Sequence, residues 1–161
     1  MMQDLNLDVR LADYVRSLDK ALNGLVDVVR RLGPAAHERP DIPGANTAVA
    51  VLSHCTGVMR FWGAKVAAGA DVSRDREAEF RSDHDAERVI ADARAQRDNL
   101  VALIESGYAD CLARPEAAEA MGARLHSVTI GGVLLHILHE VAQHHGQMQI
   151  TRDLLLRREC R

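Results

Sequence analysis

Apolar residues recur every three or four positions along the first part of the chain, which is the spacing of one face of an α-helix. The pattern predicts a helix from about Leu5 to Leu32, and the Gly33-Pro34 pair should end it. Residues 33–46 hold three of the four prolines, so we expect a loop there. The predicted helix face consists of Leu7, Leu11, Tyr14, Leu18, Leu22, Leu25, Val29 and Leu32.

Three further stretches show the same helical spacing. The second helix is predicted from Asn46-Thr47, where either side chain can cap free amides, to about Ala68. The third should open at Ser82-Asp83 and end near Gly107, with the acidic residues Asp85 and Glu87 in its first turn. The fourth is predicted to begin at 127–129 and to continue to about Arg158.

Two longer connections separate these helices. We expect a loop with a short turn at 69–81 and a long connection at 107–126, with a helical turn around 116–121. No stretch has the alternating pattern of a strand, and no internal repeat or domain boundary is visible. The sequence therefore predicts an all-α four-helix bundle that forms a single domain over residues 1–161.

Composition narrows the range of functions. A hydrophobic fraction of 47% and a charged fraction of 27% are typical of a soluble globular protein. A net charge of -3 and only 3% aromatic residues argue against a nucleic-acid partner. No apolar run approaches the roughly 18 residues that span a bilayer, and the N-terminus lacks a signal-peptide pattern. Three cysteines without a CxxC pair (Cys55, Cys111 and Cys160) predict reduced thiols and a cytoplasmic location.

The last predicted helix carries four of the eight histidines within ten residues. At about 100° per residue, His136, His144 and Gln147 lie within roughly 40° of Glu140 on a helical wheel. His139 and His145 point well away from this face, so we expect His139 at the surface or at an interface. Glu140 and His144 are one turn apart and present an oxygen and a nitrogen to one point, which is metal-ligand spacing.

Glu140 and His144 border the apolar stripe of the same helix, where a carboxylate is unfavourable unless an arginine or a metal pairs with it. The zinc-protease pattern HExxH is excluded, because Gln143 stands where the second histidine is required. In the second helix, His54 is a polar residue on an apolar face. Alone, it would more often be a packed core histidine. With Glu140 and His144 it completes a two-His, one-carboxylate set that fits zinc with an open position, and the pattern leaves both interpretations open.

The segments NTAVAVLSHCTGVMRFW and HILHEVAQHHGQMQITRDLL together resemble the DinB/YfiT-like superfamily of four-helix metal proteins. The chain is most similar to the mycothiol-dependent branch, which includes thiol S-transferases and the N-terminal domain of mycothiol-dependent maleylpyruvate isomerase. The resemblance implies an up-down-down-up bundle. It also implies that His54, Glu140 and His144 bind a divalent metal, usually zinc, with Ni²⁺ or Mn²⁺ as alternatives, and that mycothiol is the co-substrate.

The isomerase has an additional C-terminal domain that contributes to its active site, whereas this chain ends just after the fourth predicted helix. We therefore expect a stand-alone thiol S-transferase, in which mycothiol binds the metal as thiolate and attacks a small electrophile. Two alternatives stay open: a metal-dependent hydrolase that uses activated water at the same site, and a non-enzymatic metal-binding or interaction bundle. A homodimer is a further expectation.

Other residues receive weaker assignments, and none is assigned as catalytic. His136, Gln147 and Arg60 are candidate substrate contacts, and Lys65 could join Arg60 at the mouth of the pocket. Cys55 and Trp62 are expected to be packing residues. The mixed-charge stretch SRDREAEFRSDHDAER, residues 73–88, is interpreted as a solvated loop and helix start.

Overall fold

The computed structural model describes residues 10–81, 83–106 and 129–159, and these residues form helices and loops without a strand. The all-α prediction is therefore confirmed for this part of the chain. The elements, in chain order, are α1 (Leu11–Leu32), the 3₁₀-helix η1 (Gly33–His37), α2 (Ala48–Arg60), the π-helix η2 (Phe61–Ala67), α3 (Arg76–Glu79), α4 (Ala86–Glu105) and α6 (Ile130–Glu159).

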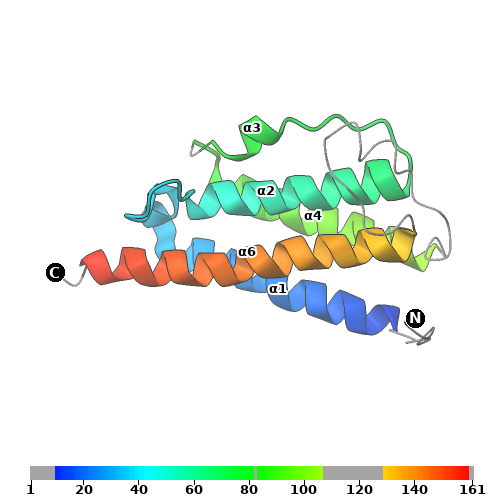
Figure 1. The fold of residues 1–161 in the computed structure, drawn as a ribbon, viewed down its shortest axis with the longest axis horizontal. Coiled ribbons are helices and arrows are strands. Elements are labelled where there is room, and N and C mark those ends of the chain that lie inside the picture. Colours follow the sequence, from blue (N-terminus) through cyan, green and yellow to red (C-terminus); the bar gives the residue numbers. More distant parts are fainter. Residues whose placement is uncertain (1–9, 82, 107–128, 160–161) are drawn as a thin grey trace, which may run out of the picture.

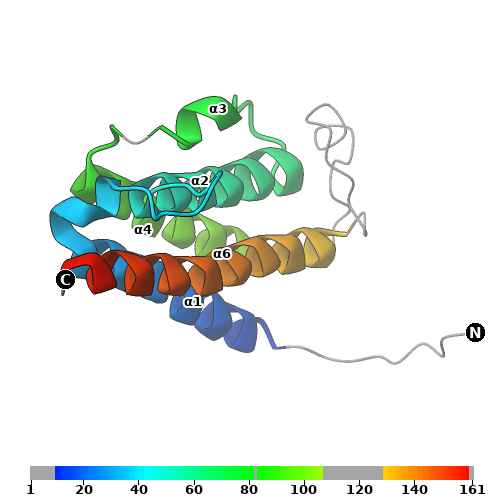
Figure 2. The same cartoon turned by 60° about the vertical axis from the view of Figure 1, so that its left-hand side comes forward.

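The four long helices lie side by side in a bundle (Figure 1). Helices α1 and α6 run in one direction and α2 and α4 in the other, which is the up-down-down-up order implied by the resemblance (Figures 1 and 2). Helix α1 packs mainly on α6, and α2 packs on both α4 and α6. The short helix α3 lies on the outer side of α2, in the connection that returns the chain to the start of α4 (Figure 2).

The core is mainly aliphatic, as the low aromatic content requires. All four long helices contribute fully buried side chains, and these form one continuous cluster. Because one face of each helix removes its apolar side chains from water, burial of this cluster is the main force that holds the bundle together. The largest fully buried side chains are Leu18, Leu25, Leu52, Met59, Phe61, Ile90, Ile130, Ile137 and Met148.

Helix α1 begins at Leu11 because Arg10 has an extended backbone, so the described part of the helix starts later than predicted. The part of the predicted helix at 5–9 lies outside the described residues. Gly33 ends the helix with a positive φ of 52°, a conformation that glycine adopts without a steric penalty. The expected loop that follows begins instead as the 3₁₀-helix η1, because Pro34 suits the first turn of such a helix.

The second predicted helix divides into two parts. Thr47 caps α2 as predicted, since its hydroxyl accepts a hydrogen bond of 3.2 Å from the Ala50 amide. After Arg60 the chain continues as a π-helix, which the apolar pattern did not reveal. Phe61 and Trp62, adjacent in sequence, are both buried in this segment.

Helices α3 and α4 are each capped by an aspartate. Asp75 accepts from the Ala78 amide at 3.0 Å, and Asp85 accepts from the Arg88 amide at 2.7 Å. Helix α4 therefore begins after Asp85, later than the predicted start at 82–83, because Asp85 supplies the side-chain oxygen that caps its first turn. The predicted helical turn at 116–121 lies outside the described residues. No helix in the described ranges is long and apolar enough to cross a membrane.

Candidate metal centre

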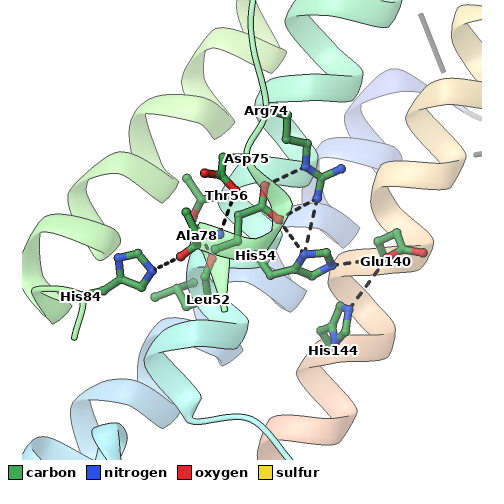
Figure 3. A network of polar contacts seen from close by, with 10 residues as sticks. Leu52, His54, Thr56, Arg74, Asp75, Ala78, His84, Glu140 and His144 are labelled. Carbon is green, nitrogen blue, oxygen red and sulfur yellow. Dashed lines mark hydrogen bonds and ion pairs between the residues drawn. The ribbon is translucent and has the colours of Figure 1, made fainter. Parts of the chain in front are cut away.

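Three side chains from two helices converge near the middle of the bundle (Figure 3). His54 of α2 faces Glu140 and His144 of α6, and one ligand atom from each lies within 4.8 Å of the other two. Glu140 Oε2 is 3.9 Å from His54 Nε2 and 3.8 Å from His144 Nε2. The structure thus brings together the three residues that the sequence singled out.

The second nitrogen of each imidazole is already engaged. His54 Nδ1 lies 2.9 Å from Glu79 Oε2, and His144 Nδ1 lies 2.8 Å from Gln147 Oε1. A neutral imidazole that donates through Nδ1 has its lone pair on Nε2. Both histidines can therefore present an Nε2 lone pair toward the Glu140 carboxylate.

The arrangement fits a divalent metal. The distances from Glu140 Oε2 to the two histidine Nε2 atoms are too long for hydrogen bonds, so the carboxylate is not hydrogen-bonded to either ring. Tetrahedral zinc, with bonds of roughly 2.0–2.2 Å, places its ligand atoms about 3.4 Å apart, so small side-chain rotations would suffice. The His54 side chain is 4% exposed and that of Glu140 is 27% exposed, so the group is accessible from the Glu140 side.

A buried ion pair supports His54 from behind. Arg74 donates to Glu79 twice, from Nε at 2.7 Å and from Nη2 at 2.9 Å, and both side chains are nearly inaccessible. Burial alone would raise the pKa of Glu79, but hydrogen bonds from His54 and Arg74 and the positive charge of Arg74 hold it below its usual value. Glu79 is therefore held as an ionised carboxylate beside His54 Nδ1.

This ion pair corrects the interpretation of residues 73–88 as a solvated stretch. Arg74 and Glu79 fold back onto α2, where Gly57 leaves the space: a Cβ atom at Gly57 would lie only 2.0 Å from Glu79 Oε1. The charged stretch at 73–88 has no apolar pattern that would predict its burial. The one available signal is the Arg-x-x-x-x-Glu spacing, which is too common to be informative by itself.

A small cavity of about 140 Å³ adjoins two of the three converging residues, His54 and Glu140. His136 belongs to its lining, and its ring centroid is 4.3 Å from that of Trp62, so this predicted contact lies beside the site. Trp62 is buried as expected but also forms part of the cavity wall. The lining residues are His54, Val58, Phe61, Trp62, Arg74, Arg76, His136 and Glu140.

Two predicted contacts lie elsewhere. Arg60 is exposed, donates to the Ser73 carbonyl at 3.3 Å and lines a different cavity of about 330 Å³ between α2, α3 and α4. Lys65 donates to the Val72 carbonyl at 3.1 Å. Both cations thus hold the segment that precedes α3, Arg60 from the last residue of α2 and Lys65 from η2. Gln147 contacts His144 directly.

His139, His145 and Cys55 behave as the sequence indicated. His139 is exposed, and the ring of His145 lies over Gly24 of α1, away from the cluster. Cys55 is buried, and burial raises the pKa of its thiol. The nearby negative charges of Glu140 and Glu79 raise this pKa further. Its packing role is consistent with this environment, because a protonated thiol is a poor nucleophile. Cys111 and Cys160 lie outside the described residues.

A helical bundle with a His-Glu-His group between facing helices defines a class of proteins that build their ligand sites inside the bundle. Within that class, a family model described as mycothiol S-transferase matches residues 13–156, and the chain belongs to this family. The match includes all three converging residues and confirms the resemblance noted from the sequence. Comparisons with curated proteins and with solved structures gave no match.

Proposed function

We propose that this protein is a metal-dependent mycothiol S-transferase that joins the thiol of mycothiol to a small electrophile. His54, Glu140 and His144 would hold the ion, with zinc expected and Ni²⁺ and Mn²⁺ as alternatives. The observation that carries the proposal is the convergence of two imidazole nitrogens and one carboxylate oxygen within 4.8 Å, in a chain of the mycothiol S-transferase family.

The donor set suits the activation of a thiol. A bound divalent ion supplies Lewis acidity, which lowers the pKa of a thiol in contact with it so that the nucleophilic thiolate is present near neutral pH. Two neutral imidazoles and one carboxylate cancel only one of the two positive charges, and the Arg74–Glu79 pair adds no net charge. The surroundings therefore favour a negatively charged sulfur.

The adjoining cavity would receive the electrophile. Phe61 and Trp62 form apolar walls, and its volume of about 140 Å³ suits a small molecule. His136 and Arg76, also in the lining, can orient polar groups of that molecule. Cys55 does not take part, because its thiol is buried and protonated, so the sulfur that is transferred comes from the co-substrate.

The direct test uses protein freed of metal with a chelator and then loaded with Zn²⁺, Ni²⁺ or Mn²⁺. We expect a reactive electrophile to be consumed only when both the metal and mycothiol are present. Turnover that does not depend on an added thiol would contradict the proposal and favour the hydrolase.

The variant Glu140→Ala should weaken zinc binding by more than about 100-fold, beyond the roughly 10–100-fold effect of losing a hydrogen bond to a ligand. His139→Ala is the matched control, since His139 is the preceding residue of α6 but is exposed on another face. Zinc content measured by elemental analysis should fall in the first variant and not in the second. An unchanged zinc content in Glu140→Ala would show that the ligands are misassigned.

A further inference from the structure

We propose that Glu79, aligned by Arg74, is a positioning residue that fixes the tautomer of His54 and thereby presents its Nε2 lone pair to the metal. This inference rests on the proposed function, because it concerns the same metal centre. It assigns a role to two charged residues that lie in the connection between α2 and α4.

The contacts of His54 Nδ1 decide which tautomer forms. Glu79 Oε2 lies 2.9 Å from this nitrogen, whereas Arg74 Nη2 lies 3.4 Å from it. An ionised carboxylate can only accept, so a Nδ1 atom without a proton would face it lone pair to lone pair. Protonated Nδ1 instead donates a charge-assisted hydrogen bond at a normal distance. The geometry therefore favours the Nδ1–H tautomer, which leaves Nε2 free.

Arg74 makes this arrangement possible. A buried carboxylate without a partner would be neutralised or displaced toward water, whereas two hydrogen bonds from one guanidinium hold both of its oxygens. Phe80, which follows Glu79, stacks on the His54 ring with centroids 4.7 Å apart. The ring is thus held at its edge by a hydrogen bond and on its face by an aromatic contact.

Hydrogen bonds hold in place the segment that carries Arg74 and Glu79. Lys65 and Arg60 donate to the carbonyls of Val72 and Ser73, directly before Arg74. The Asp75 cap then starts α3, at the end of which Glu79 reaches His54. The positions of Arg74 and Glu79 are therefore set by contacts made to α2 and η2, which also carry His54 and the walls of the cavity.

The variant Glu79→Gln tests the tautomer directly. Arg74 donates to both carboxylate oxygens, so a glutamine at this position can keep only one of these two hydrogen bonds. We expect its amide oxygen to stay on Arg74 Nε, the Arg74 Nη2 hydrogen bond to be lost, and its NH₂ group to face His54 Nδ1. That orientation requires Nδ1 to accept, so the ring should change to the Nε2–H tautomer. Glu77→Gln is the matched control, because Glu77 is an exposed carboxylate on the same helix.

Two measurements apply to the metal-free and zinc-loaded proteins. Long-range ¹H–¹⁵N spectra of the metal-free proteins report which nitrogen of His54 carries the proton, with the signal assigned by its loss in His54→Ala. Competition with a chromophoric chelator gives the zinc dissociation constant, which we expect to rise about 10–100-fold in Glu79→Gln and to stay unchanged in Glu77→Gln. Circular dichroism verifies that each variant is folded.

An Nδ1–H tautomer and a zinc affinity that both stay as in the wild type would overturn the inference while the proposed function stands. A wild-type protein that binds none of Zn²⁺, Ni²⁺ and Mn²⁺ would overturn the proposed function and this inference with it. If Glu79→Gln does not fold, Arg74→Gln is the second variant. It removes the cation that aligns the carboxylate and should weaken zinc binding about 10-fold; an unchanged affinity would again overturn the inference.

Discussion

At the scale of single residues, neighbours decide what each histidine of α6 can do. His144 and His145 are adjacent, yet His144 faces Glu140 and Gln147 while His145 lies over Gly24 of α1. Successive residues of a helix differ by about 100° in direction, so one faces the centre of the bundle and the other a neighbouring helix. The helical wheel predicted this division because it depends on local geometry alone.

The buried hydroxyl of Tyr14 makes no hydrogen bond to any residue in the described ranges. We expect Tyr14→Phe to leave the free energy of unfolding unchanged or to raise it by up to about 1 kcal/mol, because it removes an unpaired buried polar group without changing the packing. Chemical denaturation at neutral pH measures this difference. A loss of more than about 1 kcal/mol would mean that the hydroxyl has a stabilising partner.

Tyr14 also predicts a pH dependence. Burial raises the pKa of its phenol above the ordinary value of 10.0. The stabilising contribution is therefore fully present below about pH 10 and is lost as the pH rises further, because only the unfolded chain releases the proton there. Denaturation curves between pH 9 and 11 should show a smaller loss of stability in Tyr14→Phe than in the wild type. Equal losses would contradict this assignment.

At the scale of elements, the site depends on how closely α3 approaches α2. Gly57 permits this approach, since a methyl group there would occupy the place of the Glu79 carboxylate. The π-helix η2 continues α2 and supplies Phe61 and Trp62 to the cavity. The continuous stretch of α2 and η2 thus carries three parts of the site. These are the proposed ligand His54, the glycine that gives Glu79 its space, and two residues of the cavity wall.

The variant Gly57→Ala should therefore destabilise the protein by about 1–3 kcal/mol, because the added methyl group overpacks a filled space. It should also weaken zinc binding, since it displaces Glu79 from His54. Gly146→Ala in α6 is the control: apart from its chain neighbours and the backbone of its own helix, no atom of the described residues lies within 4 Å of the added methyl group. This change should stabilise the helix by up to about 1 kcal/mol. Thermal and chemical unfolding of both variants check the pair, and equal effects would contradict the proposed contact.

At the scale of the whole molecule, charged pairs join helices that are distant in the sequence. Arg97 of α4 donates to both carboxylate oxygens of Asp19 in α1, each at 2.7 Å. These hydrogen bonds raise the pKa of Arg97 further above its ordinary value. Because both side chains are partly exposed, we expect Asp19→Asn to reduce the free energy of unfolding by only about 0.5–1 kcal/mol, and less at high salt. Urea denaturation at two salt concentrations measures this, and a salt-independent loss would contradict the electrostatic explanation.

A metal held between α2 and α6 would also stabilise the bundle. Zinc at 100 times its dissociation constant should add about 2.7 kcal/mol, because it binds the folded chain in preference to the unfolded one. For a protein of this size, that corresponds to a rise in Tm of roughly 5–10 °C. Calorimetry should detect the rise in the wild type and His139→Ala but not in Glu140→Ala. No rise in the wild type would argue against a site that links the two helices.

Local periodicity was sufficient to predict the all-α fold and to single out His54, Glu140 and His144. Each of these residues interrupts an apolar face, and in a bundle such faces meet at a common centre. The resemblance, and not the spacing, supplied the helix order. The π-helical end of α2 and the late start of α4 were missed, because pattern alone does not reveal where hydrogen bonding changes or which aspartate caps.

Only the tertiary structure showed that Arg74 and Glu79 are buried against His54. Their stretch of chain reads as solvated because charged residues are normally exposed, and local sequence cannot reveal a space that Gly57 opens in another helix. The identity of the candidate ligands is thus a property of single helix faces, which the amino-acid order determines. Their support is a property of packing between segments, which exists only once the bundle and its connections have folded.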